Sequence, residues 1–190
     1  MLLPGFPITA KLIENIAHSW YSVHIIHRNI IWKRGFSMLP MPTRFNLVAG
    51  SSEGTTLLNA FDGALLKAGA GNLNLVRVSS VLPPGAVYDE HLSIPPGNLV
   101  PTAYGAIDSD EPGTIISAAV GVGIPDDNSF GMIMEVSGRF SKKVAEETVR
   151  QMVVEAFQMR NKTLAEVKIK AVEHKVIKIG CAFAGVLLWY

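Results

Sequence analysis

The stretch Gly71–Pro84, GNLNLVRVSSVLPP, decides how the rest of the chain is interpreted. Apolar residues alternate loosely over 72–81, which predicts a β-strand that carries two adjacent serines, Ser79 and Ser80. A serine hydroxyl beside a backbone carbonyl is a latent nucleophile that strain and a hydrogen-bond donor can activate. Serine pairs are also common in turns, so the surrounding sequence has to separate the two interpretations.

Helical patterns lie on both sides of this stretch. A helix is predicted over 55–68, with hydroxyl residues that can cap its start and Gly69 at its end. The strongest helical pattern runs over 142–160, where Ser141 can act as the cap. Asp62 lies at the edge of the apolar stripe of the first helix, so we expect it to point into a partly buried groove.

The remaining segments favour strands. Strands are predicted over 45–50, 114–124, 130–136, 167–179 and 181–190, with a turn at 125–128 that makes a hairpin of the second and third. Residues 83–112 contain six of the eleven prolines and are predicted to be rich in loops. Two helices and several strands without regular βαβ alternation predict an α+β sandwich.

Composition limits the classes of function. The chain has 190 residues, enough for one domain with a substantial core, and its 17% of charged residues suggests that other subunits cover part of the surface. A formal net charge of +1 gives no reason to expect nucleic acid or an anionic membrane as a partner. No apolar stretch reaches the roughly 20 residues that span a bilayer. The single cysteine, Cys181, cannot form an intrachain disulfide and is expected to be a buried thiol.

Residues 1–40 differ from the rest and are predicted to be an N-terminal extension of unknown role. Residues 13–31 could form an amphipathic helix, and a secretory signal fits the segment poorly. Two interpretations of residues 1–37 stay open, a peripheral arm or an upstream extension of the reading frame, with Met38 or Met41 as the natural start. His24 and His27 could face the same way, but without a third ligand they are expected to be solvated helix residues.

The stretch quoted first resembles the self-cleavage segment of the pyruvoyl-dependent arginine decarboxylases. The resemblance runs from about Asn46 to Tyr190 and does not cover the first forty residues. Several segments carry it in the same order: Val48–Gly54, Leu58–Leu66, Leu99–Gly105, Ile133–Glu135, Ala171–His174, Gly180–Ala184 and Leu188–Tyr190.

This resemblance implies a fold, an activity and a cofactor. The fold would be a four-layer αββα sandwich, assembled as trimers or dimers of trimers with the site between subunits. Residues 41–190 would form one domain, and self-cleavage would divide the chain into 1–79 (β chain) and 80–190 (α chain). A pyruvoyl group derived from Ser80, with no pyridoxal phosphate and no metal, would form a Schiff base with L-arginine. The products would be agmatine and CO2, made in the cytoplasm for polyamine biosynthesis.

The resemblance also implies roles for individual residues. The Ser80 hydroxyl would attack the Ser79 carbonyl, Asn74 would assist this processing by steadying the oxyanion, and Glu135 would protonate the substrate carbon after decarboxylation. The remaining matched residues would bind the substrate: Asp62 the guanidinium, Leu58 and Phe61 its aliphatic part, Gly71 and Leu73 its amino-acid end, and Ser51 or Ser52 a further hydrogen bond. Glu173 and His174 belong to the resemblance without a role beyond a polar pair near a subunit contact.

Two alternatives to arginine decarboxylation stay open at this point. The same chemistry could act on another amino acid, although a carboxylate at Asp62 argues against an acidic substrate. The chain could also be an uncleaved homologue that acts as a small-molecule binding or assembly subunit. From the residues alone, Asn74 could be a strand asparagine bonded to neighbouring backbone, Glu135 an outward-facing strand carboxylate and Asp62 an exposed helix residue.

Overall fold

The computed structural model describes residues 40–190, and the helix and histidines predicted within 1–39 lie outside the described residues. Two sheets form the centre of this part of the chain. The five-stranded sheet has the order β2-β5-β9-β1-β4, made of Asn74–Arg77, Leu99–Ser109, Gly180–Trp189, Arg44–Glu53 and Val87–Tyr88. The four-stranded sheet has the order β3-β7-β6-β8, made of Val81–Leu82, Gly131–Gly138, Ile115–Pro125 and Leu164–Lys175.

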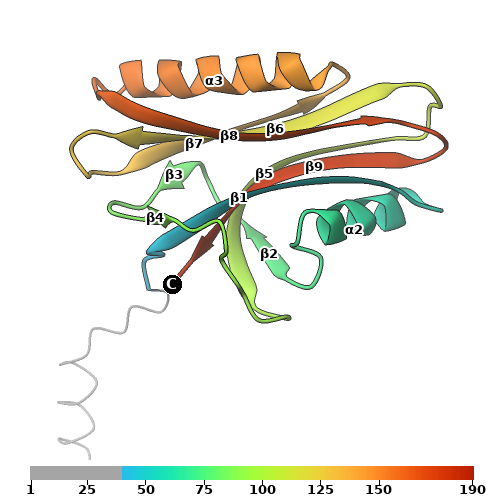
Figure 1. Ribbon diagram of the computed structural model, residues 1–190, viewed down its shortest axis with the longest axis horizontal. Helices are drawn as coiled ribbons and strands as arrows, with labels where there is room; N and C mark the ends of the chain where they lie inside the picture. Colours follow the sequence, from blue (N-terminus) through green and yellow to red (C-terminus); the bar gives the residue numbers. More distant parts are fainter. Residues whose placement is uncertain (1–39) are drawn as a thin grey trace, which may run out of the picture. The chain divides into compact units, whose positions relative to one another are not determined.

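The two sheets stack face to face, and one helix covers the outer face of each (Figure 1). Helix α2, Leu57–Lys67, packs on β1 and β9 of the five-stranded sheet, and helix α3, Lys142–Gln158, packs on the four-stranded sheet. Apolar side chains from both sheets fill the space between them, including Phe45, Ile116 and Ile133, each 0% exposed. This arrangement confirms the predicted four-layer αββα sandwich.

Both predicted helices are present, with caps where the sequence places them. The hydroxyl of Thr56 accepts a hydrogen bond from the Asn59 amide at the start of α2. The helix ends at Lys67 with Ala68 as its C-cap, and Gly69 follows with a φ of 77°, a backbone angle that glycine adopts without strain. Ser141 caps α3 in the same way, through the Val144 amide. None of the helices in residues 40–190 is long and apolar enough to cross a membrane.

The prediction of loops over residues 83–112 is wrong for 99–109, which form the eleven-residue strand β5. Pro101 does not break this strand, because the ladder between β5 and β9 begins one residue later, at Thr102 and Leu187. On the other side of the strand, Pro101 is paired with Val76 of β2 in parallel register.

The prediction of one strand over residues 72–81 is also wrong, and the difference matters for the site. Residues 74–77 form β2 at the edge of the five-stranded sheet, whereas residues 81–82 form β3 at the edge of the four-stranded sheet. Ser79 and Ser80 therefore lie in the segment that crosses between the sheets. The Val78 amide donates to the Thr102 carbonyl at 3.2 Å on the first sheet, and the Ile133 amide donates to the Ser80 carbonyl at 2.9 Å on the second.

The C-terminal strands are close to expectation. Strand β8 ends at Lys175, four residues before the predicted end, because residues 176–179 turn around the side chain of Glu53. Strand β9 is apolar and buried as predicted. Cys181 lies in it with 1% of its surface exposed, and burial, with a smaller contribution from Asp108, raises the pKa of its thiol to about 12. The prediction of a buried thiol is confirmed.

Candidate active site

The hydroxyl of Ser80 lies against the carboxylate of Glu135. Ser80 Oγ donates a hydrogen bond of 3.1 Å to Glu135 Oε2, and both residues are half-buried. Glu135 is the fifth residue of β7 and lies on the same face as Ile133, which belongs to the core between the sheets. The structure thus brings together two residues that are 55 positions apart in the sequence and that the resemblance assigns to the same reaction.

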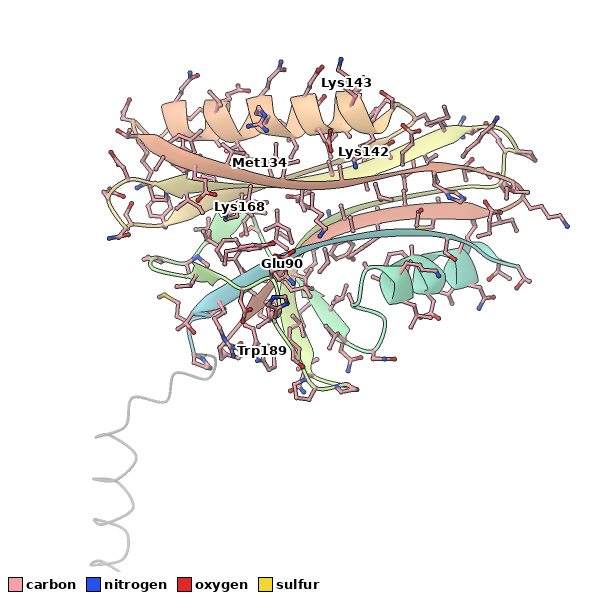
Figure 2. All side chains as sticks on the ribbon, in the orientation of Figure 1. Glu90, Met134, Lys142, Lys143, Lys168 and Trp189 are labelled. Carbon is pink, nitrogen blue, oxygen red and sulfur yellow. The ribbon has the colours of Figure 1, made fainter. Side chains whose placement is uncertain are left out.

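Contacts with both sheets fix the strand that carries Glu135. It pairs with Val120 of β6, and its neighbour Met134 points the other way, towards α3 (Figure 2). Two residues further on, the Ser137 hydroxyl donates to the Ala106 carbonyl of β5 at 3.0 Å, a polar tie between the two sheets. The carboxylate therefore projects from a strand whose register and distance from the other sheet are both fixed.

The backbone around the two serines forms a tight turn. The Val81 amide donates to the Ser79 carbonyl at 2.9 Å, which makes Ser80 the central residue of a three-residue γ-turn. Ser79 is exposed, whereas Leu82, two residues beyond Ser80, is buried to 3% exposure and anchors β3. The Ser79–Ser80 peptide is accessible, and the chain on either side of it is fixed to a different sheet.

Asn74 lies at the opposite end of β2 from the serines. Its side-chain amide donates to the Gly97 carbonyl at 2.7 Å, and its backbone amide donates to the Asn98 carbonyl. These bonds fix the loop before β5. Within the chain, the side-chain amide of Asn74 is hydrogen-bonded to Gly97 and not to the Ser79 carbonyl. The predicted role of Asn74 in processing stays a prediction.

Asp62, Leu58 and Phe61 lie on α2, as predicted, but they face in two directions. Phe61 packs on Phe183 of β9, with 6.0 Å between ring centroids. Leu58 is 74% exposed, and Asp62, one turn further along the helix, is exposed and has no salt-bridge partner among residues 40–190. The expectation that Asp62 points into a partly buried groove is therefore wrong for the single chain.

The other predicted substrate residues surround the same helix. Ser52 lies under α2, where a Cβ on Gly63 would meet its hydroxyl at 2.5 Å, and the hydroxyl donates to the Glu53 carbonyl. Ser51 precedes it on β1, paired with Ala182. Gly71 lies against Leu66 at the end of α2, and Leu73 packs into the core beneath the helix.

The five-stranded sheet separates these two groups of residues. Helix α2, which carries Asp62, covers the outer face of that sheet, whereas Glu135 projects from the other sheet into the space between the two. The five-stranded sheet therefore lies between the two carboxylates. Stacked sheets lie about 10 Å apart. One chain therefore presents the Ser80–Glu135 pair and the Asp62 face as two half-sites.

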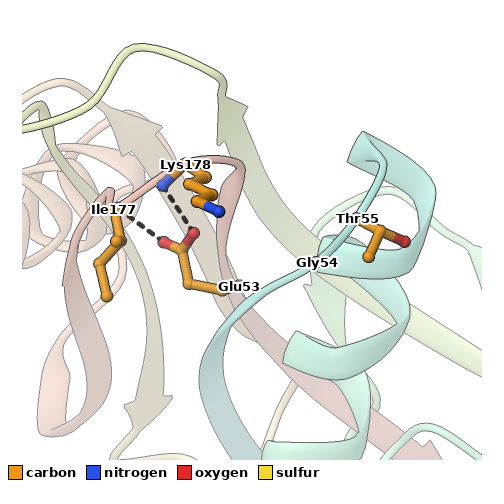
Figure 3. Close-up of a pocket in the computed structure, with 5 residues that line it drawn as sticks. All are labelled: Glu53, Gly54, Thr55, Ile177 and Lys178. Carbon is orange, nitrogen blue, oxygen red and sulfur yellow. Dashed lines mark hydrogen bonds between the residues drawn. The ribbon is translucent and has the colours of Figure 1, made fainter.

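A group of polar contacts around Glu53 gave no signal in the sequence. Its carboxylate accepts backbone N–H bonds from Ile177 and Lys178, both at 2.9 Å (Figure 3). It accepts a third from Ile179 at 3.0 Å, and His174 Nε2 lies 2.6 Å from Oε1. Burial acts to raise the pKa of Glu53, but the hydrogen bonds from these four residues together outweigh it and lower the pKa to about 2.

His174 and Glu173 each make a structural contact. His174 helps to hold Glu53, and Glu173 accepts a 2.7 Å bond from the backbone amide of Lys142 at the start of α3. Both side chains fix the fold within the chain. Glu53 was missed because its partners lie more than 120 positions away.

Arg77 is a second residue that the sequence did not single out. Its guanidinium lies 4.8 Å from the ring centroid of Tyr104 and donates to the Tyr104 carbonyl at 3.1 Å. Tyr104 in turn packs on Phe183, the partner of Phe61. The last residue of β2 is therefore clamped to β5 two positions before Ser79.

The matching family profile and the relatives similar in sequence share one description. The sequence profile of the family "Pyruvoyl-dependent arginine decarboxylase (PvlArgDC)" matches residues 44–188. A pyruvoyl-dependent arginine decarboxylase of Methanocaldococcus jannaschii is 57% identical over 151 residues, which cover 79% of this chain and 92% of that protein. Proteins of the same description from Methanococcus maripaludis and Pyrococcus abyssi are 47% and 46% identical, over 78% of this chain and 92% and 96% of theirs.

A solved structure of a pyruvoyl-dependent histidine decarboxylase aligns with 51% of this chain and 52% of its own, at 15% identity and a TM-score of 0.43, too little to carry any inference. The family profile and the relatives of 46–57% identity span nearly all of the described residues. The chain belongs to the pyruvoyl-dependent arginine decarboxylase family.

Proposed function

We propose that this protein cleaves its own chain between Ser79 and Ser80 and then converts L-arginine to agmatine and CO2. The observation that carries the proposal is the 3.1 Å hydrogen bond from Ser80 Oγ to Glu135 Oε2. A carboxylate at this distance can accept the hydroxyl proton while the oxygen attacks the neighbouring carbonyl. The matched family supports both the cleavage and arginine as the substrate.

The fold suits a break at this peptide. Residues before the serines belong to one sheet and residues after them to the other, with Val78 and Ser80 each held by a backbone hydrogen bond to its own sheet. Cleavage would therefore leave both new ends attached to separate, intact sheets, and the core between the sheets would not be disturbed.

The residues present fit a pyruvoyl group derived from Ser80, because the hydroxyl that would start its formation is hydrogen-bonded to the carboxylate of Glu135. When present, that group supplies a carbonyl that condenses with the substrate amine and takes up the electrons released with CO2. Glu135 would then hold a proton beside residue 80, where the substrate carbon has to be protonated. The same carboxylate would thus accept a proton during processing and donate one during turnover.

Arginine would be recognised by Asp62 of a neighbouring copy of the chain. A carboxylate and a guanidinium form a paired, charge-assisted contact, and Asp62 is an exposed carboxylate on a helix that also exposes Leu58 and Leu66, 74% and 55%. Near the serines, Val76 and Val81 are 43% and 44% exposed. In an oligomer, the surface with Leu58 and Leu66 on one subunit would contact the surface with Val76 and Val81 on the next. This contact would bring the two half-sites together, as expected for trimers.

A denaturing gel and an assay of arginine-dependent CO2 release test the proposed activity. We expect two fragments that meet at residues 79 and 80, and CO2 release with arginine but not with aspartate or histidine. Asp62→Asn should cleave normally and lose arginine turnover, while Asp126→Asn, an exposed carboxylate in the β6–β7 turn, should behave as wild type. A single uncleaved band without arginine turnover would refute the proposal.

Mixed oligomers test the shared site. Ser80→Ala keeps Asp62 but cannot form the cofactor, and Asp62→Asn forms the cofactor but cannot bind the guanidinium. Each variant alone should be inactive, whereas co-expressed subunits should regain activity at the sites that combine an intact half from each. Absence of any recovery in verified mixed oligomers would place the complete site within one chain.

A further inference from the structure

The self-cleavage proposed above needs a donor for the negative charge that develops on the Ser79 carbonyl oxygen. The Ser80 Oγ–H proton passes to Glu135, a bond forms from Oγ to the Ser79 carbonyl carbon, and the carbonyl electron pair moves onto oxygen. When that pair returns, the bond from the Ser79 carbon to the Ser80 nitrogen breaks, and the amine takes the proton back from Glu135. The step is an isomerisation of amide to ester and needs no further reactant.

We infer that the backbone N–H of Val81 is this oxyanion donor. It already donates to the Ser79 oxygen at 2.9 Å, the distance at which such donors act on a developing oxyanion. The amide of Asn74, the donor that the resemblance suggests, is bonded to the Gly97 carbonyl at the other end of β2. Among residues 40–190 the Val81 amide is the donor that the structure places on the reacting oxygen.

The turn aligns the three groups that the reaction needs. Ser80 is its central residue, so the nucleophile lies between the carbonyl that it attacks and the amide that polarises that carbonyl. Outside the turn, the Ile133 amide holds the Ser80 carbonyl, and buried Leu82 fixes β3 on β7. These contacts hold the Val81 N–H in place before reaction, which is what makes an oxyanion donor effective. Ser80 has a negative φ, so the geometry does not depend on a strained backbone.

The test removes this one N–H and leaves the side chain unchanged. The proenzyme is made by cell-free translation, with Val81 replaced by the corresponding α-hydroxy acid. This replacement converts the Ser80–Val81 amide into an ester. We expect cleavage between Ser79 and Ser80, followed on denaturing gels, to slow by about 100- to 1000-fold. Intact masses identify the broken bond and exclude hydrolysis of the new ester.

The control places the same ester at Ala86, whose amide donates at 3.2 Å to the Pro83 carbonyl in another turn. This variant should cleave at the wild-type rate. Cleavage of the Val81 ester within threefold of wild type would overturn the inference. A failure of that variant to fold would also contradict it, because the proposed role of this N–H is in the reaction. If wild type itself did not cleave, the proposed function would fail instead.

Discussion

Glu53 is predicted to be the most important charged residue for stability, and Glu53→Gln tests this. The substitution keeps the size of the side chain but replaces one carboxylate oxygen with an NH2 group. In the structure the two oxygens together accept three backbone N–H bonds and face His174. The amide of glutamine would point a donor at a donor, so at least one of these N–H groups would lose its partner.

The size of the effect follows from the pKa. A lowering from 4.5 to about 2 corresponds to roughly 3 kcal/mol of interaction with the charged carboxylate. The side chain is 28% exposed, and solvent screening reduces the expected loss to about 2 kcal/mol. For a chain of this length, that loss should lower Tm by about 4 to 8 °C.

The effect should also depend on pH. Because the pKa of Glu53 is lower in the folded protein, its contribution is complete above the unfolded value of 4.5 and is lost as the pH falls towards 2. The assay is urea unfolding at pH 7 and at pH 3, in a Ser80→Ala background that keeps the chain continuous and at one protein concentration. The difference between wild type and Glu53→Gln should be about 2 kcal/mol at pH 7 and clearly smaller at pH 3.

Glu166→Gln provides the matched control, because this carboxylate pairs with Lys168 on the surface and is 54% exposed. Its removal should change the free energy of unfolding by less than 0.5 kcal/mol, roughly the typical worth of an exposed pair. A difference for Glu53→Gln that was equally large at both pH values, or no larger than that of Glu166→Gln, would refute the reasoning.

Three further predictions concern packing and burial. Gly180→Ala should destabilise the protein by about 1 to 3 kcal/mol in urea unfolding, because its Cβ would lie 2.6 Å from the His174 ring and 2.9 Å from Glu53 Oε1. Leu82→Ala should cost about 2 to 4 kcal/mol and slow self-cleavage on denaturing gels, since this buried side chain anchors β3; an unchanged cleavage rate would show that β3 does not position Ser80. The Cys181 thiol, with its pKa raised to about 12, should not react with a disulfide reagent at pH 8 until the protein is unfolded in urea.

The sequence predicted well those features that depend on local pattern. The two helices begin after hydroxyl caps and bury one apolar stripe each, and the apolar run of β9 forms a buried strand. Local pattern misled where long-range pairing decides the structure. Strand β5 contains Pro101 and forms nevertheless, because that residue precedes the ladder with β9. The alternation over 72–81 looks like one strand, although its two ends pair with different sheets.

In the candidate site, too, some features could be predicted from the sequence and others could not. Ser80 and Glu135 were predicted from the resemblance, and the fold brings them into contact. The positions of Asn74 and Asp62 relative to the serines could not be predicted, because they depend on the loop at Gly97 and on which sheet face α2 covers. The turn that places the Val81 amide on the Ser79 carbonyl arises from the crossing between sheets, which no local pattern in the sequence encodes.

Intact mass of the purified protein, measured under denaturing conditions, tests the central claim most directly. The account predicts two species, residues 1–79 and residues 80–190, and the second should be lighter than a serine-terminated chain by the mass of ammonia. Reduction with borohydride should add two hydrogens to the second species alone. A single species with the mass of the uncleaved chain, or a second fragment with an ordinary serine terminus, would contradict the account.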